Sequence, residues 1–184
     1  MDGDMQLRRL IFGLIMAIAL PAMQAGAADL ENTLYLELKD GRVTIELRPD
    51  LAPNHVTRIK ELVRQNFYDG IVFHRVIEDF MAQTGDPTGT GTGGSGQNLA
   101  AEFSDEKHLR GTLSMARSAS PDSADSQFFI VFKASSWLDG QYTVWGQVTD
   151  GMERVDNIKM GAAGSGAVDD PDKIITLRVA ADVE

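Results

Sequence analysis

The sequence predicts a mostly-β domain that folds as a closed antiparallel barrel with two helices. Its apolar runs are short and separated by turns, glycine is frequent at 18 of 184 residues, and only two stretches have a helical pattern. The alternation of strands and long helices that builds a parallel sheet is missing. With neither an internal repeat nor an interdomain linker, residues 28–184 are expected to form a single domain.

Residues 33–39 and 42–48 predict a β-hairpin. Apolar and polar side chains alternate in both segments, and a two-residue turn, Asp40-Gly41, separates them. Alternation places every second side chain on the same face of a strand. One buried face should therefore collect Leu34, Leu36, Leu38, Val43, Ile45 and Leu47.

The first helix should begin at Pro53 and extend to about Gln65. Its apolar residues recur at helical spacing, so one stripe should face the sheet. That stripe consists of Val56, Ile59 and Val63.

Five further apolar runs predict strands. They cover residues 71–77, 111–117, 127–132, 142–148 and 173–180.

A second, shorter helix is expected over residues 151–158, with Asp150 as its cap and Glu153 three residues on. Met152, Val155 and Ile158 should face inward. The glycine-rich residues 84–96 and 161–172 are interpreted as surface loops.

The first 27 residues have the pattern of a signal peptide. Two arginines, Arg8 and Arg9, precede an apolar run over residues 10–20, and the small residues 25–27 follow. We expect cleavage after Ala27 or Ala28. The run is shorter than the roughly 20 apolar residues that a membrane span needs, so an uncleaved anchor is the less favoured alternative.

Export and the absence of cysteine favour a bacterial periplasm, because the fold then needs no disulfide in an oxidising compartment. Met5 is an alternative start to Met1, since it would leave a purely positive segment before the apolar run. After cleavage we expect no membrane association.

The formal charge of −10 argues against a nucleic-acid partner, because phosphate binding requires clustered Lys and Arg. Residues 84–96 fit the G-x-G-x-x-G spacing from Gly89 and from Gly91, but no helix follows to supply an anion site. No basic residue lies between Arg75 and Lys107 either. A nucleotide-binding role is therefore the least favoured hypothesis.

Other common sites are also unsupported. His55, His74 and His108 lack the spacing of helical metal ligands and have no accompanying cluster of carboxylates or thiols. The G-x-S-x-G pattern of a hydrolase is missing. No metal or cofactor is expected.

The chain resembles the cyclophilins, the family of peptidyl-prolyl cis-trans isomerases. Four motifs carry the resemblance in order: F-H-R-V-I from Phe73, F-M-x-Q-x-G-D from Phe80, S-Q-F-F-I from Ser126 and W-L-D-G from Trp137. It extends over essentially all of residues 28–184. It implies an eight-stranded antiparallel barrel with a helix closing each end, which agrees with the elements above.

The resemblance assigns roles to single positions. Arg75 stands at the catalytic arginine, and Gln83 and Gln127 match polar groups that orient the arginine and the substrate backbone. Ala116 and Arg117 match the strand that pairs with the substrate main chain. The proline pocket would be lined by Phe80, Met81, Phe129 and Leu138, with Trp137 and Tyr142 at the rim.

Some of these assignments have support from the residues themselves. Phe128 and Phe129 are adjacent in a strand, so one should face the core and the other the pocket. Residues 84–96 would fold beside the proline groove, where glycine leaves room for a peptide. Arg117 replaces an asparagine common in cytosolic eukaryotic members, which is typical of bacterial forms.

The resemblance implies isomerisation of X-Pro bonds during the folding of exported proteins. The alternative is a chaperone or adaptor module that binds proline-containing segments, with catalysis incidental. We expect a monomer. Tyr142 occupies a position that is histidine in many eukaryotic members, so binding of cyclosporin should have reduced affinity.

Overall fold

The computed structural model describes residues 29–183, in which eight strands form one curled sheet accompanied by two α-helices. The strands are β1 (Thr33–Leu38), β2 (Gly41–Leu47), β3 (Arg75–Ile77), β4 (Met81–Thr84), β5 (Thr112–Met115), β6 (Phe128–Val131), β7 (Val144–Asp150) and β8 (Thr176–Val179). The helices are α1 (Pro53–Arg64) and α2 (Met152–Asp156), with short 3₁₀ turns η1 (Leu30–Asn32), η2 (Pro121–Ser123), η3 (Ser136–Leu138) and η4 (Ala180–Asp182). The predicted signal peptide and its cleavage site lie outside the described residues.

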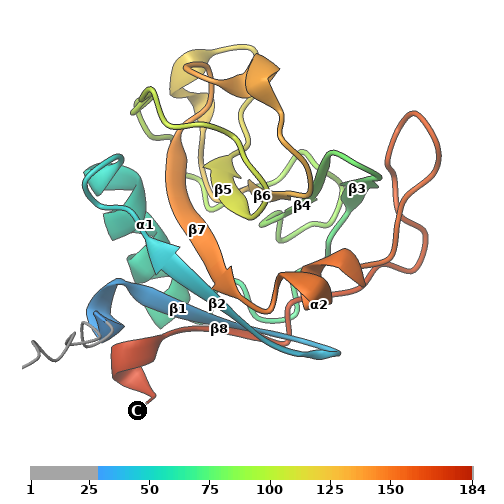
Figure 1. Cartoon of the computed structure of the whole chain (residues 1–184), viewed down its shortest axis with the longest axis horizontal. Coiled ribbons are helices and arrows are strands. Elements are labelled where there is room, and N and C mark those ends of the chain that lie inside the picture. Colours follow the sequence, from blue (N-terminus) through green and yellow to red (C-terminus); the bar gives the residue numbers. More distant parts are fainter. Residues whose placement is uncertain (1–28, 184) are drawn as a thin grey trace, which may run out of the picture.

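The prediction of a closed barrel is wrong, because the hydrogen-bonded strands form an open sheet. The strand order is β3-β4-β6-β5-β7-β2-β1-β8, so β3 and β8 are edges that do not pair with each other. Figure 1 shows the result as a curled half-barrel, with β1, β2 and β8 on one side and β3 to β6 on the other. Two isolated bridges, Val72–Lys173 and Arg75–Ala167, join the segments that flank the open edges.

The first hairpin forms with its turn one residue earlier than predicted. Leu38 pairs with Gly41, so Lys39 and Asp40 make the two-residue loop. Gly41 has φ +120°, which explains why a glycine closes this turn. Across the hairpin Leu36 pairs with Val43, and the predicted apolar face is buried.

The second helix also differs at its start. Residue Gly151, with φ +82°, is the N-cap of α2, and Asp150 instead ends β7. A strand that continues to Asp150 leaves it extended in the ladder opposite Thr44, where it cannot serve as a cap. Val155 and Ile158 are buried as predicted, and Met152 is partly buried.

The buried apolar side chains of the described residues form two separate clusters. The larger one joins both helices to the inner face of the sheet and contains Phe128 and Trp145. The smaller one consists of Met81, Phe129, Val131 and Leu138, with Ile77, Phe80, Ala116 and Tyr142 packed against it. The predicted opposite orientation of Phe128 and Phe129 is confirmed, and it places one ring in each cluster.

The N-terminus of α1 is capped from a distant loop. Its own cap position, Ala52, has no side-chain oxygen, and the Glu102 carboxylate accepts hydrogen bonds from the Asn54 and His55 N–H groups at 3.1 and 3.0 Å. Glu102 also contacts His55 Nδ1 at 2.6 Å. Burial alone would raise the pKa of Glu102, but the hydrogen bonds from His55 and Asn54 outweigh it and lower that pKa.

We predict that Glu102→Ala lowers the free energy of unfolding by about 1–2 kcal/mol at neutral pH, because two helix N–H groups and a buried imidazole lose their acceptor. A carboxyl whose pKa is lowered by folding contributes stability above its unfolded pKa and loses it as the pH falls through the folded pKa. The difference between wild type and variant should therefore be complete above about pH 5 and shrink toward about pH 3.

Urea denaturation at both pH values measures this difference. Glu61→Gln is the control, because Glu61 is an exposed acid of the same helix and should change stability by less than about 0.5 kcal/mol. A Glu102 variant as stable as wild type at neutral pH would contradict the capping role.

Candidate functional site

The smaller hydrophobic cluster forms the floor of a pocket of about 120 Å³. Strands β4 and β6 supply Met81 and Phe129, and η3 supplies Leu138. Phe129 and Tyr142 meet edge to face with ring centroids 5.9 Å apart. The pocket is lined by Arg75, Phe80, Met81, Gln83, Ala116, Arg117, Phe129, Leu138 and Tyr142.

A chain of side-chain hydrogen bonds leads away from Arg75. Arg75 on β3 lies opposite Gln83 on β4, and Arg75 Nη1 donates a hydrogen bond to Gln83 Oε1 at 3.4 Å. Gln83 Nε2 donates to Gln127 Oε1 at 2.9 Å. Gln127 Nε2 in turn donates to the Gly91 and Gly93 carbonyls at 3.1 and 2.8 Å. Each glutamine amide is thereby fixed in one orientation, with every donor in this series of hydrogen bonds on the Arg75 side and every acceptor on the side of the glycine-rich loop.

The guanidinium of Arg75 keeps its charge uncompensated. Among residues 29–183 it has no ion pair with an Asp or Glu, and its acceptors are the neutral Gln83 amide and the Ser165 carbonyl. Asp79, an acid in the turn that follows β3, pairs with Lys133 at 3.3 Å instead. A half-buried cation held by neutral groups can still attract developing negative charge in the pocket.

Ala116 and Arg117 follow the end of β5 rather than lying within it. The Ala116 N–H donates to the Gln127 carbonyl at 2.9 Å, so it is already used within the protein. The Arg117 guanidinium lies 4.5 Å from the centre of the Tyr142 ring and donates to the Gln141 carbonyl. Both residues line the pocket, and Arg117 is a second cation beside Arg75 in its lining.

Trp137 and Phe80 form an aromatic rim. The Trp137 side chain is 59% exposed, and its ring centroid lies 5.5 Å from that of Phe80. Trp137 does not line the pocket itself, whereas Phe80 does. This placement suits contacts with a ligand that extends beyond the pocket.

The glycine-rich loop over residues 84–96 folds around the carboxylate of one of its own residues, Asp86. Asp86 is buried and accepts hydrogen bonds from the N–H groups of Thr88, Thr90, Gly91 and Gly93. Burial alone would raise the pKa of Asp86, but the Thr88 hydroxyl and these N–H groups outweigh it and lower that pKa.

The same loop borders a groove that continues from the pocket. This groove has a volume of about 390 Å³ and shares Gln83, Ala116 and Arg117 with the pocket. Its lining also includes Gly91, Gly93 and Gly94, which places the loop beside the groove as predicted.

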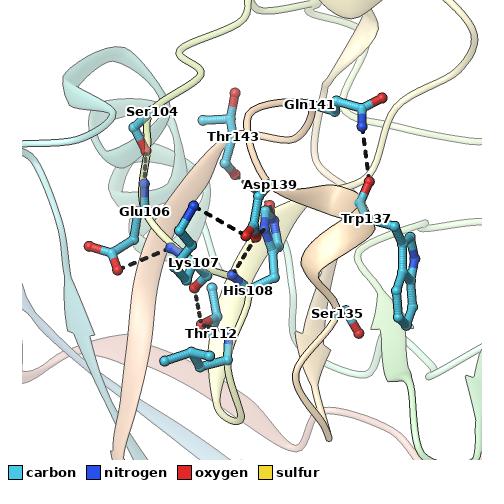
Figure 2. A network of polar contacts seen from close by, with 12 residues as sticks. Ser104, Glu106, Lys107, His108, Thr112, Ser135, Trp137, Asp139, Gln141 and Thr143 are labelled. Atoms are coloured by element: carbon cyan, nitrogen blue, oxygen red, sulfur yellow. Dashed lines mark hydrogen bonds and ion pairs between the residues drawn. The ribbon is translucent and has the colours of Figure 1, made fainter.

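A buried network supports the pocket from behind, and Figure 2 shows its contact between His108 and Asp139. His108 Nδ1 lies 3.0 Å from Asp139 Oδ1, Nε2 lies 3.1 Å from the Ser114 hydroxyl, and the ring stacks on Phe129 at 6.3 Å. Burial lowers the pKa of His108, and Asp139 opposes that shift. Ser114, His108 and Asp139 are hydrogen-bonded in the same order as the serine, histidine and aspartate of a hydrolase triad. However, Ser114 is fully buried and its hydroxyl donates to the Thr143 carbonyl, so it is not available as a nucleophile.

Sequence reasoning missed three contributors to the site. The Ser165 carbonyl, which accepts from Arg75 Nε at 3.2 Å, lies in a segment interpreted only as a surface loop. Backbone groups leave no signature in a sequence. Asp86 could have been found, because an acid that opens a glycine-rich segment is surrounded by N–H groups free to donate. His108 was rejected as a metal ligand and interpreted as a core or surface imidazole, with no role in the site.

Comparison with known proteins gives one consistent result. The family model described as "Cyclophilin type peptidyl-prolyl cis-trans isomerase/CLD" matches residues 33–179. A probable peptidyl-prolyl cis-trans isomerase of Brucella suis is 54% identical over 182 residues, covering 91% of this chain and 93% of the relative. Peptidyl-prolyl cis-trans isomerase B of Bacillus subtilis is 44% identical over 133 residues, covering 71% of this chain and 92% of the relative.

Solved structures show the same similarity. The cyclophilin AquaCyp293 from Hirschia baltica has a TM-score of 0.76 at 27% identity, covering 85% of this chain and 76% of that chain. A cyclophilin-type isomerase of Cryptosporidium parvum, crystallised in the presence of the dipeptide Ala-Pro, has a TM-score of 0.74 at 29% identity. That match covers 80% of this chain and 98% of the other.

We predict that Asp86→Asn releases the glycine-rich loop, because one buried amide cannot replace a carboxylate that accepts at both oxygens. The free energy of unfolding should fall by about 1–3 kcal/mol, and the amide protons of Gly91 and Gly93 should lose protection against hydrogen exchange. NMR-detected exchange measures both effects. Asp105→Asn, an exposed change of the same type, is the control; protection retained in Asp86→Asn would contradict the anchoring role.

Proposed function

The chain belongs to the cyclophilin-type peptidyl-prolyl cis-trans isomerases, and we propose that its isomerase activity assists the folding of proteins exported to a bacterial periplasm. One observation supports the catalytic part most strongly: an uncompensated guanidinium stands at the edge of an apolar pocket of proline size. The pattern of residues 1–27 supports the location. We further propose a monomer that binds proline-containing segments and has reduced affinity for cyclosporin, because Tyr142 with Arg117 stacked on it fills the rim.

The reaction makes and breaks no covalent bond. Rotation about a peptide C–N bond is opposed by a barrier of about 18–20 kcal/mol that arises from its double-bond character. In the twisted state the proline nitrogen loses conjugation, becomes pyramidal and gains a lone pair. A catalyst must therefore bind this state more tightly than either planar isomer.

Arg75 is placed to make that distinction. Its Nε and Nη1 are held by Ser165 and Gln83, while Nη2 has no hydrogen-bond partner among residues 29–183. In the proposed mechanism Nη2 donates to the lone pair of the twisted proline nitrogen, which a planar amide offers only weakly. The proline ring occupies the pocket floored by Met81 and Phe129.

Rotation must be confined to one bond, so the chain on either side of the proline has to be held. The Gln83 and Gln127 amides are fixed by their hydrogen bonds; Gln83 borders both the pocket and the groove, and Gln127 borders the groove. The Arg117 main chain and the rim ring of Trp137 provide further contacts along the peptide. Holding these parts lowers the entropy lost at the transition state.

The alternative is a chaperone or adaptor that binds proline-containing segments, with catalysis incidental. The exposed Trp137 and the long groove favour peptide binding under either hypothesis. Only the catalytic hypothesis requires a free guanidinium donor at the pocket, so substitution of Arg75 separates the two.

We predict that Arg75→Ala lowers kcat/KM for an X-Pro peptide by about 100-fold or more, the range for loss of one preorganised transition-state donor. Peptide affinity, measured by NMR titration, should change far less. Arg110→Ala is the control, because Arg110 pairs with Asp156 outside the pocket. Unchanged exchange between cis and trans peptide in Arg75→Ala would reject the mechanism and favour the binding module.

The rate should also be nearly independent of pH across neutrality, because an arginine guanidinium stays protonated and no acid or base takes part. The assay between about pH 6 and 8, with and without a chelator, measures this. A bell-shaped profile or inactivation by the chelator would contradict the proposed chemistry.

A further inference from the structure

Residues 161–167, here named the Arg75 loop, extend the edge of the sheet beside β3. The Val76 N–H donates to the Gly166 carbonyl at 2.8 Å, and the Gly161 N–H donates to the Val76 carbonyl at 3.0 Å. An isolated antiparallel bridge joins Arg75 to Ala167. Figure 1 shows the chain that follows α2 projecting beside β3, although the two segments are far apart in sequence. Main-chain bonds therefore attach the Arg75 loop directly to the strand that carries the catalytic arginine.

The Arg75 loop also contacts the arginine side chain. The Ser165 carbonyl accepts from Arg75 Nε at 3.2 Å, while Gln83 Oε1 accepts from Nη1 at 3.4 Å. A guanidinium is planar, so two acceptors at two of its nitrogens fix both the position and the tilt of that plane. The remaining nitrogen, Nη2, is then left for the substrate.

Gly166 makes this close approach possible. It is buried although its neighbours 162–165 and 167 are exposed. A Cβ atom there would lie 2.4 Å from Ile77 Cγ1 and 3.2 Å from Arg75 Cγ, and its φ of +73° is a conformation that side chains disfavour. A residue larger than glycine would therefore displace the Ile77 and Arg75 side chains, or move the Arg75 loop and its Ser165 carbonyl away from β3.

We propose that Ser165 and Gly166 are positioning residues for catalysis, acting through Arg75: the Ser165 carbonyl aims the guanidinium, and Gly166 holds that carbonyl in place. This inference rests on the proposed catalytic role of Arg75. Without the Nε contact the arginine would rotate about its flexible stem, and a displacement of about 1 Å from the reacting atom can reduce a rate by about 100-fold. Ser165 and Gly166 therefore belong to the active site, although neither contributes a side chain to the pocket.

The chain offers a matched pair of variants. Gly164 lies in the same loop and also has a positive φ, +84°, but a Cβ there would meet nothing within 4 Å. Gly164→Ala therefore introduces similar backbone strain without displacing the Arg75 loop from β3. We expect Gly166→Ala to lower kcat for an X-Pro peptide by about 10- to 100-fold with KM little changed, and Gly164→Ala to stay within about twofold of wild type.

A double-mutant cycle with Arg75→Ala shows whether the effect passes through the arginine. If it does, adding Gly166→Ala to Arg75→Ala should change kcat/KM by less than about twofold, because the positioned group is already gone. The same loss in both backgrounds would overturn the proposal, and so would a Gly166→Ala enzyme as fast as wild type.

Two further readouts exclude a general structural effect. The NMR signal of the Arg75 Nε–H should exchange slowly with water in wild type and Gly164→Ala and rapidly in Gly166→Ala. A thermal melt of each variant checks that the folded state persists; a rate loss that only tracks unfolding would also overturn the proposal. If Arg75→Ala alone leaves the rate intact, the proposed function fails; if Arg75→Ala is slow but uncoupled to Gly166, only this inference fails.

Discussion

The pairing of β4 with β6 is the constraint on which the rest of the site depends. Met81 lies opposite Val131 and Gln83 lies opposite Phe129, so the two strands share one register. Because side chains alternate along a strand, this register sends Phe128 into the main core and Phe129 to the other face. A slip of one residue would either exchange the two rings or turn the Gln83 amide toward the core. The stability of the core and the shape of the pocket are therefore fixed by the same hydrogen bonds.

Polar groups extend this register to both ends of the site. At one end Asp86 holds the glycine-rich loop, whose carbonyls orient the Gln127 amide. At the other end Ser165 holds Arg75. Between them Gln83 can donate to Gln127 only if its oxygen faces the arginine, so the direction of every amide follows from its neighbour. The arginine and the two amides are held by neutral acceptors, and the Asp86 carboxylate anchors the glycine-rich loop at one end.

Sequence reasoning succeeded where a periodic pattern decides the structure. The hairpin faces, the α1 stripe and the opposite orientation of the two phenylalanines all follow from spacing, and the pocket residues came from the resemblance. It failed where tertiary contacts decide: Asp150 continues β7 instead of capping α2, and β4 has too few apolar residues to form a recognisable run. The open sheet edges could not be predicted either. The segment around Ala167, and not β8, lies next to β3, and it pairs with β3 through the isolated bridge to Arg75. No pattern in a sequence shows which backbone carbonyl lies next to a side chain.

The neutrality of the groups around Arg75 deserves a physical explanation in a chain with 27 acidic residues and a net charge of −10. A carboxylate at Ser165 or Gln83 would hold the guanidinium more firmly, but it would also occupy the donor and oppose any negative charge that develops at a twisted amide. A carbonyl and an amide fix the same geometry while leaving the charge available. The turn after β3 supports this arrangement, because Asp79 has φ +58° and pairs with Lys133 rather than with the arginine. The neutral acceptors and the pairing of Asp79 with Lys133 thus serve one requirement, a cation that is fixed in place and still unpaired.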